Sequence, residues 1–142
     1  MSVLVVDASV VIKWFLPEVH GEAARRLLAA PHQYLAPDLL FPEVGNVIWK
    51  KIRRGELTPR DGQRLAADLA TVAVEAVASR VLLSDAVALA VATGLTVYDA
   101  TYLALAVRLD TVLVTADERF GRAVAAAPTA AAHVRMVQTF ES

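Results

Sequence analysis

Four acidic residues stand where the chain is expected to pass from one element of secondary structure to the next. Asp7 and Asp117 come just after short apolar runs that are typical of buried parallel strands, whereas Glu43 and Asp99 lie near the predicted starts of two helices. Ligand sites in open parallel sheets lie beyond the carboxyl ends of the strands, so Asp7 and Asp117 point to the expected cleft. If the four carboxylates meet there, their mutual repulsion raises their pKa values unless a cation lies among them.

The residue types favour one kind of ion. The chain has no cysteine, and its three histidines, His20, His32 and His133, are scattered without the spacing of metal ligands. A cluster of carboxylates alone is a hard oxygen site, which suits Mg²⁺ or Mn²⁺ rather than Zn²⁺. Sites of this kind serve phosphoryl chemistry, in which the ion polarises a phosphate and activates water.

Each acid also has a purely structural explanation. Aspartate is strongly preferred at helix N-caps, so Asp7, Asp99 and Asp117 are all candidate caps. Glu43, in the first turn of its helix, would complement the helix dipole. Spacing along the chain does not show whether the side chains converge, so both explanations stay open at this stage.

Other reactions that depend on a single aspartate fit the sequence less well. A haloacid-dehalogenase-like phosphatase needs a second aspartate two residues after the first, and that position is Ser9. A receiver domain needs a lysine late in the chain, but the lysines are Lys13, Lys50 and Lys51. No glycine-rich phosphate loop is present, which argues against nucleoside triphosphate or dinucleotide binding.

Bulk properties limit the class of protein. The 142 residues, 56% of them hydrophobic, predict one globular domain over 1–142. A net charge of −1 leaves no global positive field, so any nucleic-acid contact must come from a local patch. The first seven residues lack a basic segment, and no apolar run is long enough to span a membrane. We therefore expect a cytoplasmic protein with no membrane partner.

Apolar runs and helical stripes alternate along the chain. Strands are predicted at 3–6, 33–36, 72–77, 112–115 and 134–137. Helices are predicted at 9–16, 21–30, 42–54, 58–71, 99–109 and 117–126. A further helix is predicted to begin after a cap at Ser79 or Ser84 and to end at residue 92. Pro128 and Thr129 are expected to break the alanine-rich run as a loop. The alternation predicts an α/β fold with a mostly parallel sheet.

Four segments resemble the PIN-domain ribonucleases, and most closely the VapC toxins of type II toxin–antitoxin pairs. They occur in the family's order and at about its spacing across nearly the whole chain, and each contains one of the four acids. The segments are 5–9 with the short helix after it, 42–46, 98–106 and 113–120.

The resemblance implies a PIN-like sheet of about five strands flanked by helices, and a Mg²⁺- or Mn²⁺-dependent endoribonuclease. It implies that the catalytic residues are Asp7, Glu43, Asp99 and Asp117. The first three would hold the metal, so that metal-activated water hydrolyses an RNA phosphodiester bond, whereas Asp117 would orient water or tune the charge. The matching supporting positions are Ser9, Asn46 and Thr115.

Six of the fourteen basic residues fall within fifteen positions, and they are Lys50, Lys51, Arg53, Arg54, Arg60 and Arg64. They form either a solvated helix face or a patch that contacts RNA phosphates. The resemblance adds a cognate VapB-type antitoxin as another partner for this region, and it also implies a homodimer. The alanine- and leucine-rich helices at 21–30 and 84–92 are candidate dimer surfaces.

Three other functions remain as alternatives. The chain could be a PIN nuclease for RNA processing without an antitoxin, or a catalytically silent PIN module that binds RNA or protein. It could also be an unrelated α/β protein in which the four acids only cap helices. The presence of all four acids argues against the silent module.

Overall fold

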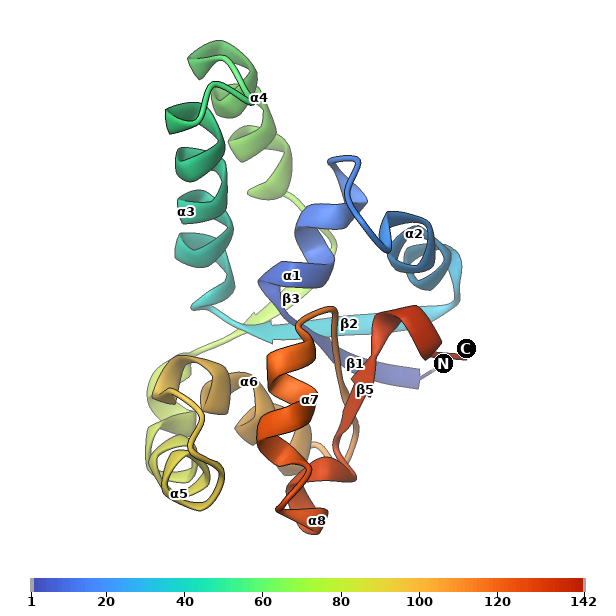
Figure 1. Cartoon of the computed structure of the whole chain (residues 1–142), viewed down its shortest axis with the longest axis vertical. Helices are drawn as coiled ribbons and strands as arrows, with labels where there is room; N and C mark the ends of the chain where they lie inside the picture. The colour runs from blue at the N-terminus through green and yellow to red at the C-terminus, as the bar shows by residue number, and fades with distance from the viewer. Residues whose placement is uncertain (1, 142) are drawn as a thin grey trace.

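The computed structural model describes residues 2–141 and contains a five-stranded sheet in which every neighbouring pair is parallel (Figure 1). The strand order is β3-β2-β1-β4-β5. The strands are β1 (Ser2–Val6), β2 (His32–Pro37), β3 (Val74–Val77), β4 (Leu113–Thr115) and β5 (Val134–Met136). The prediction of a mostly parallel α/β sheet is confirmed.

Helices cover both faces of the sheet. Figure 1 shows α1 to α4 above the sheet and α5 to α8 below it. The α-helices are α1 (Ala8–Val11), α2 (Gly21–Ala29), α3 (Leu40–Arg53), α4 (Pro59–Leu69), α5 (Leu83–Thr93), α6 (Val97–Arg108), α7 (Glu118–Val124) and α8 (Pro128–Ala131). Short 3-10 turns are η1 (Ile12–Trp14), η2 (Ser79–Leu82) and η3 (Val137–Thr139).

The order of the strands explains this arrangement. The chain moves outward from β1 to β2 and β3, then returns past β1 to β4 and moves outward in the other direction. Because parallel crossovers are right-handed, the reversal puts the later helices on the opposite face. The carboxyl ends of β1 and β4 therefore meet at a topological switch point, which is where open α/β sheets bind ligands.

The core centres on α6, which packs against β1, β2 and β4. All seven residues from Ala100 to Ala106 are buried, and so are Val5 and Val6 of β1. A helix that is buried all round has little amphipathic pattern, and its small alanines allow close approach to the strands. On the other face, Trp14 meets Tyr34 edge-on at 5.3 Å and donates through Nε1 to the Ala24 carbonyl at 2.8 Å.

The predictions for the starts of α5 and α8 are wrong. Neither Ser79 nor Ser84 caps the helix before residue 94, because α5 continues directly from η2 with Leu82 at its N-cap position. Pro128 and Thr129 do not form a loop but begin the short helix α8, since proline at the first helical position needs no hydrogen-bond donor.

Within residues 2–141, no single helix is long and apolar enough to cross a membrane. The segments Ser79–Thr93 and Val97–Arg108 satisfy the length and composition criteria only as a pair, and they are bent by 111° relative to each other.

Candidate active site

Asp7 lies at the end of β1 and is held by hydrogen bonds from both sides of the switch point. Its Oδ1 accepts from Ser9 Oγ at 2.6 Å and from the Val10 backbone N–H at 3.3 Å, while its Oδ2 accepts from Thr115 Oγ1 at 2.5 Å. The predicted cap is confirmed, because the Val10 bond caps α1. Burial nevertheless raises the Asp7 pKa from 3.8 to about 6, against the opposing effect of these hydrogen bonds.

The two small hydroxyl residues join the ends of β1 and β4. Ser9 Oγ accepts from the Ala116 N–H at 3.0 Å, and Thr115 Oγ1 accepts from the Asp117 N–H at 3.1 Å. The two hydroxyl oxygens lie 3.3 Å apart. Ser9 and Thr115 thus fix the Asp7 carboxylate relative to the start of α7, which gives a specific structural role to two residues that the sequence singled out.

Glu43 is a half-buried carboxylate in the first turn of α3. Burial raises its pKa, the nearby hydroxyl of Tyr102 lowers it, and the negative charge of Asp99 raises it again, so that the net change is upward. Within residues 2–141, the buried Oε1 of Glu43 and the hydroxyl of the neighbouring Tyr102 have no hydrogen-bond partner of acceptable geometry. A surface glutamate that only complements a helix dipole would not be desolvated in this way.

Asp99 is not the cap of its helix, so that prediction is wrong. Thr96 takes this position, because its side chain accepts from the Asp99 N–H at 3.2 Å and α6 begins at Val97. The Asp99 carboxylate lies partly buried in the first turn of α6. Burial raises its pKa first, followed by the negative charge of Asp117, while Arg119 and the Thr96 side chain act in the opposite direction.

Asp117 differs from the other three acids because it is already paired with a cation. It caps α7 by accepting from the Arg119 N–H at 3.0 Å, as predicted. The Arg119 guanidinium also donates to both carboxylate oxygens, from Nε to Oδ1 at 3.2 Å and from Nη2 to Oδ2 at 2.8 Å. This hydrogen-bonded pair holds the Asp117 pKa below its ordinary value.

Asp99 is electrostatically coupled to each of the other acids. Its charge raises the pKa of Asp7 and of Glu43, and the charge of Asp117 raises the pKa of Asp99. The hydroxyl of Tyr102 is part of the same neighbourhood, since burial and then the charges of Glu43, Asp7 and Asp99 raise its pKa. The fold therefore brings the four predicted acids, which come from distant parts of the chain, into one region.

The acids do not form a closed ligand set in this structure. Within residues 2–141, no three histidine or carboxylate side chains are arranged closely enough to hold an ion. The unpartnered Glu43 oxygen and the raised pKa values of Asp7, Glu43 and Asp99 are nevertheless what a hard divalent cation would relieve, so the donor set fits Mg²⁺ or Mn²⁺.

The six predicted basic residues lie on the hairpin of α3 and α4, which projects at the top of Figure 1. Arg53 lies over the half-exposed ring of Trp49, 5.9 Å from its centroid. Two of the six have acidic partners, since Lys51 Nζ pairs with Glu18 Oε2 at 3.2 Å and Arg54 Nη1 with Glu56 Oε2 at 3.9 Å. Asn46 lies one turn after Glu43 on α3 and is exposed.

Two site residues escaped the sequence interpretation. Tyr102 follows Asp99 by one helical turn, and Arg119 follows Asp117 by two residues, so their spacing from the acids was a usable signal. Their contacts depend on side-chain orientation, which spacing does not determine.

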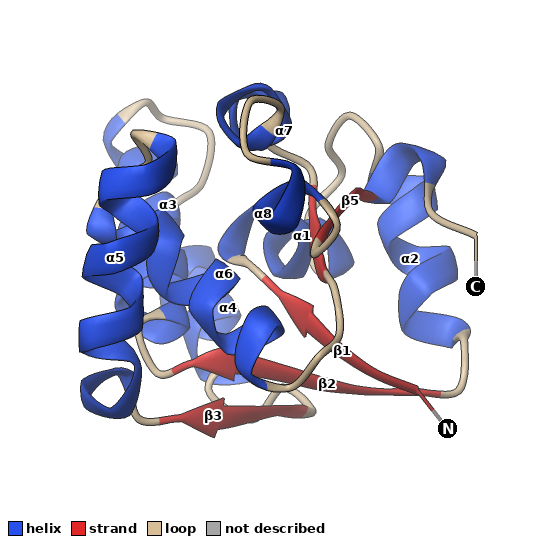
Figure 2. Cartoon of the chain, turned by 90° about the horizontal axis from the view of Figure 1, so that it is seen from below, coloured by secondary structure: helices blue, strands red, loops and turns tan. Residues whose placement is uncertain are grey.

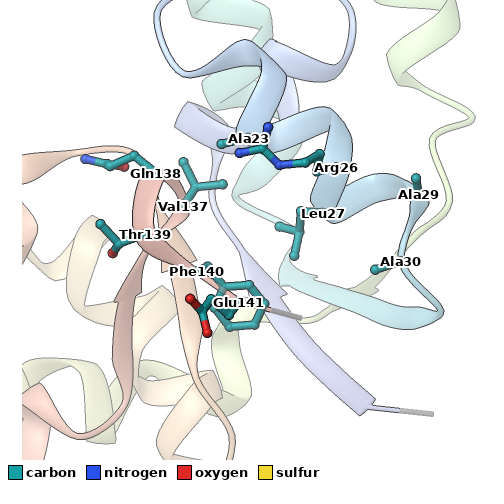
Figure 3. A pocket seen from close by; sticks show the side chains of 10 residues that line it. All are labelled: Ala23, Arg26, Leu27, Ala29, Ala30, Val137, Gln138, Thr139, Phe140 and Glu141. Atoms are coloured by element: carbon teal, nitrogen blue, oxygen red, sulfur yellow. The ribbon is translucent and has the colours of Figure 1, made fainter.

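A separate hollow of about 650 Å³ lies between α2 and the C-terminal segment (Figure 3). Its walls include Leu27 and Phe140, with Arg26 and Glu141 as charged residues. None of the four acids lines it. The candidate active site is therefore defined by the chemistry of its carboxylates and not by the volume of a cavity.

Comparisons with known proteins agree with this geometry. The model of the PIN domain family matches residues 4–125. The chain is 36% identical over 118 residues to Ribonuclease VapC3 of Pyrobaculum aerophilum, covering 82% of this chain and 90% of that protein.

Solved structures share the fold. PAE2754 from Pyrobaculum aerophilum superposes with a TM-score of 0.70 at 24% identity, covering 97% of this chain and 91% of that one. A chain of a toxin–antitoxin complex from Klebsiella pneumoniae gives a TM-score of 0.65 at 19% identity, covering 98% and 99%. Because the family model spans most of the sequence and a VapC ribonuclease is related to it over nearly its full length, the chain belongs to the PIN-domain family, among its VapC members.

Proposed function

We propose that this chain is a Mg²⁺- or Mn²⁺-dependent endoribonuclease, folded as one domain over 1–142, and the toxin of a VapBC-type pair. The observation that carries the proposal is the electrostatic coupling of Asp99 to Asp7, Glu43 and Asp117 at the sheet's switch point. The relationship to a protein named as a VapC ribonuclease supports RNA as the substrate.

In this proposal, Asp7, Glu43 and Asp99 hold the divalent cation. When bound, the ion would offset the negative charge of the phosphate and lower the pKa of the water molecule that it binds. Asp7 is the fixed member of the set, since Ser9 and Thr115 hold its two oxygens in place. Asp117 has a different role, because Arg119 already occupies both of its oxygens.

A VapB-type antitoxin is the proposed protein partner, in a cytoplasmic complex. The related fold of a chain within a toxin–antitoxin complex supports this assignment. The basic residues of the α3–α4 hairpin are the proposed contact for either the antitoxin or RNA, with Lys50, Arg53 and Arg54 around a hollow of about 190 Å³.

We place the homodimer interface on α5, at an outer edge of the molecule in Figure 2. Leu83, Val87 and Val91 of this helix are exposed, and Val91 is 84% exposed. Aspartate at Val91 should convert the dimer to a monomer, because a charge would have to be buried in an apolar interface. Sedimentation velocity measures the change. A dimer that survives Val91→Asp but dissociates in Leu28→Asp would move the interface to α2.

The toxin assignment can be tested in a bacterial host. Induced expression of the wild-type chain should arrest growth and produce RNA fragments with discrete ends, whereas Asp99→Asn should do neither. Asp85→Asn is the matched control, because Asp85 is also an acid in the first turn of a helix and is exposed. Discrete RNA cleavage without growth arrest would favour an RNA-processing nuclease, and arrest that persists in Asp99→Asn would contradict the proposed role of that residue.

A further inference from the structure

A second surface, which carries three basic side chains, shares Asp117 with the acid cluster. A hollow of about 470 Å³ is lined by Lys13 from η1, His20 from the following loop, and Arg119 and Arg122 from α7. Asp117 and Glu118 also line this hollow. The sequence did not single out this group as a site, because its basic members come from segments about a hundred residues apart. We call Lys13, Arg119 and Arg122 with the hollow between them the α7 groove.

The Arg119 guanidinium is hydrogen-bonded to Asp117 along one edge, and the rest of the side chain is exposed to solvent. Asp117 takes the Nε donor and one Nη2 donor of the guanidinium, which has five N–H groups in all. The side chain is 79% exposed. Within residues 2–141, no other side-chain or carbonyl acceptor engages the remaining N–H groups. A guanidinium fixed by a carboxylate in this way loses less freedom when it binds a second anion.

The charge of the α7 groove continues toward the α3–α4 hairpin. Glu18 bridges two lysines, with Oε1 at 3.4 Å from Lys13 Nζ and Oε2 at 3.2 Å from Lys51 Nζ. One negative charge between two positive charges leaves a net positive bridge. Through Glu18, the groove at α7 is connected by way of Lys13 to Lys51 on α3, and the two lysine side chains are 12% and 17% exposed.

A nuclease that relies on four carboxylates needs such a surface. Phosphodiester RNA is repelled by the acids, and the chain as a whole carries a net charge of −1, so attraction must come from cations near the site. The α7 groove satisfies this requirement because Asp117 belongs both to the groove and to the acid cluster. Guanidinium groups also match the geometry of phosphate oxygens.

We propose that the α7 groove binds the RNA backbone on one side of the scissile phosphate, with Arg119 and Arg122 contacting phosphate oxygens and Lys13 extending the track toward α3. This inference rests on the proposed ribonuclease function and names the surface that holds its substrate. The α3–α4 basic residues are then a more distant contact and not the primary one.

The test measures binding without cleavage. A fluorescein-labelled single-stranded RNA oligonucleotide of mixed sequence is titrated with Asp7→Asn protein in Mg²⁺, and anisotropy is followed at several KCl concentrations. Adding Arg119→Gln or Arg122→Gln should weaken binding several-fold and reduce the slope of log K against log salt by about 0.7 each. Arg119→Lys should retain the slope, because it keeps the charge. Both arginines are exposed, so thermal unfolding should match the parent.

Arg26→Gln is the matched control, since Arg26 is an exposed helical arginine that also pairs with an acid, Glu22, at 3.3 Å. The proposal is overturned if the two α7 variants behave like Arg26→Gln, or if they weaken binding to an acidic antitoxin peptide while RNA binding is unchanged. It is also overturned if the parent protein binds no RNA. If RNA binding depends on Arg119 but the wild-type protein does not cleave RNA, the ribonuclease function is refuted while the RNA-binding role of the α7 groove is supported.

Discussion

Asp7→Asn should reduce RNA cleavage at saturating Mg²⁺ by at least about a hundredfold, because a divalent cation supplies several kcal/mol of transition-state stabilisation. The substitution keeps the size of the side chain and the acceptor used by Ser9 and the Val10 N–H. It removes one negative charge where the proposed cation binds. The measurement is the single-turnover rate of cleavage of an end-labelled RNA.

Asp117→Asn is the informative comparison for this prediction. The charge of Asp117 is already offset by Arg119, so Asp117→Asn should reduce the cleavage rate much less than Asp7→Asn does. A variant Asp7→Asn that cleaves at the wild-type rate would remove Asp7 from the site. Equal losses at both positions would show that the pairing with Arg119 does not set Asp117 apart.

Asp7→Asn should also stabilise the folded protein in the absence of divalent cations. The Asp7 pKa is about 6 in the folded state and 3.8 as an ordinary aspartate. Each pKa unit corresponds to about 1.4 kcal/mol, so keeping Asp7 ionised and buried at pH 7 costs about 3 kcal/mol. An asparagine carries no such charge, and this cost would be relieved.

The pH dependence gives this prediction a definite sign. Between pH 3.8 and about 6 the unfolded chain has released the Asp7 proton while the folded chain still holds it, so stability falls as pH rises. Below that window the carboxyl is neutral in both states, and above it the full cost is present. The raised pKa values of Glu43 and Asp99 act in the same direction, whereas the lowered pKa of Asp117 acts in the opposite one.

Urea unfolding in EDTA from pH 4 to pH 8 measures this effect. The difference in unfolding free energy between Asp7→Asn and the wild type should grow through the window and level off above about pH 6. Asp85→Asn, which removes an exposed acid, serves as the matched control. Parallel curves for Asp7→Asn and the wild type would show that Asp7 is not a desolvated carboxylate.

The fold was largely predictable because its signals are local. Short apolar runs ending in acids identified β1 and β4, and alternation with helices identified the parallel sheet. Helix boundaries were less predictable where two capping residues compete. Thr96, three residues before Asp99, caps α6, so that Asp99 lies in the first turn of the helix instead of at its cap position.

The site was predictable in its residue types but not in its electrostatics. The contact of Thr115 with Asp7 joins residues 108 positions apart. It forms because the chain, after β3 at one edge of the sheet, returns to place β4 beside β1. Spacing likewise does not reveal that Arg119 folds back onto Asp117, or that Lys51 pairs with Glu18. These pairings distinguish acids and bases that look equivalent in the sequence.

The most direct test of the central claim is cleavage of purified RNA by the isolated wild-type chain in Mg²⁺, in EDTA, and in EDTA followed by excess Mn²⁺, with Asp7→Asn protein alongside. We predict discrete fragments in Mg²⁺, none in EDTA, recovery in Mn²⁺, and none from the variant in any condition. Cleavage that persists in EDTA, or that is equal in the variant, would contradict a divalent-cation site built from these carboxylates.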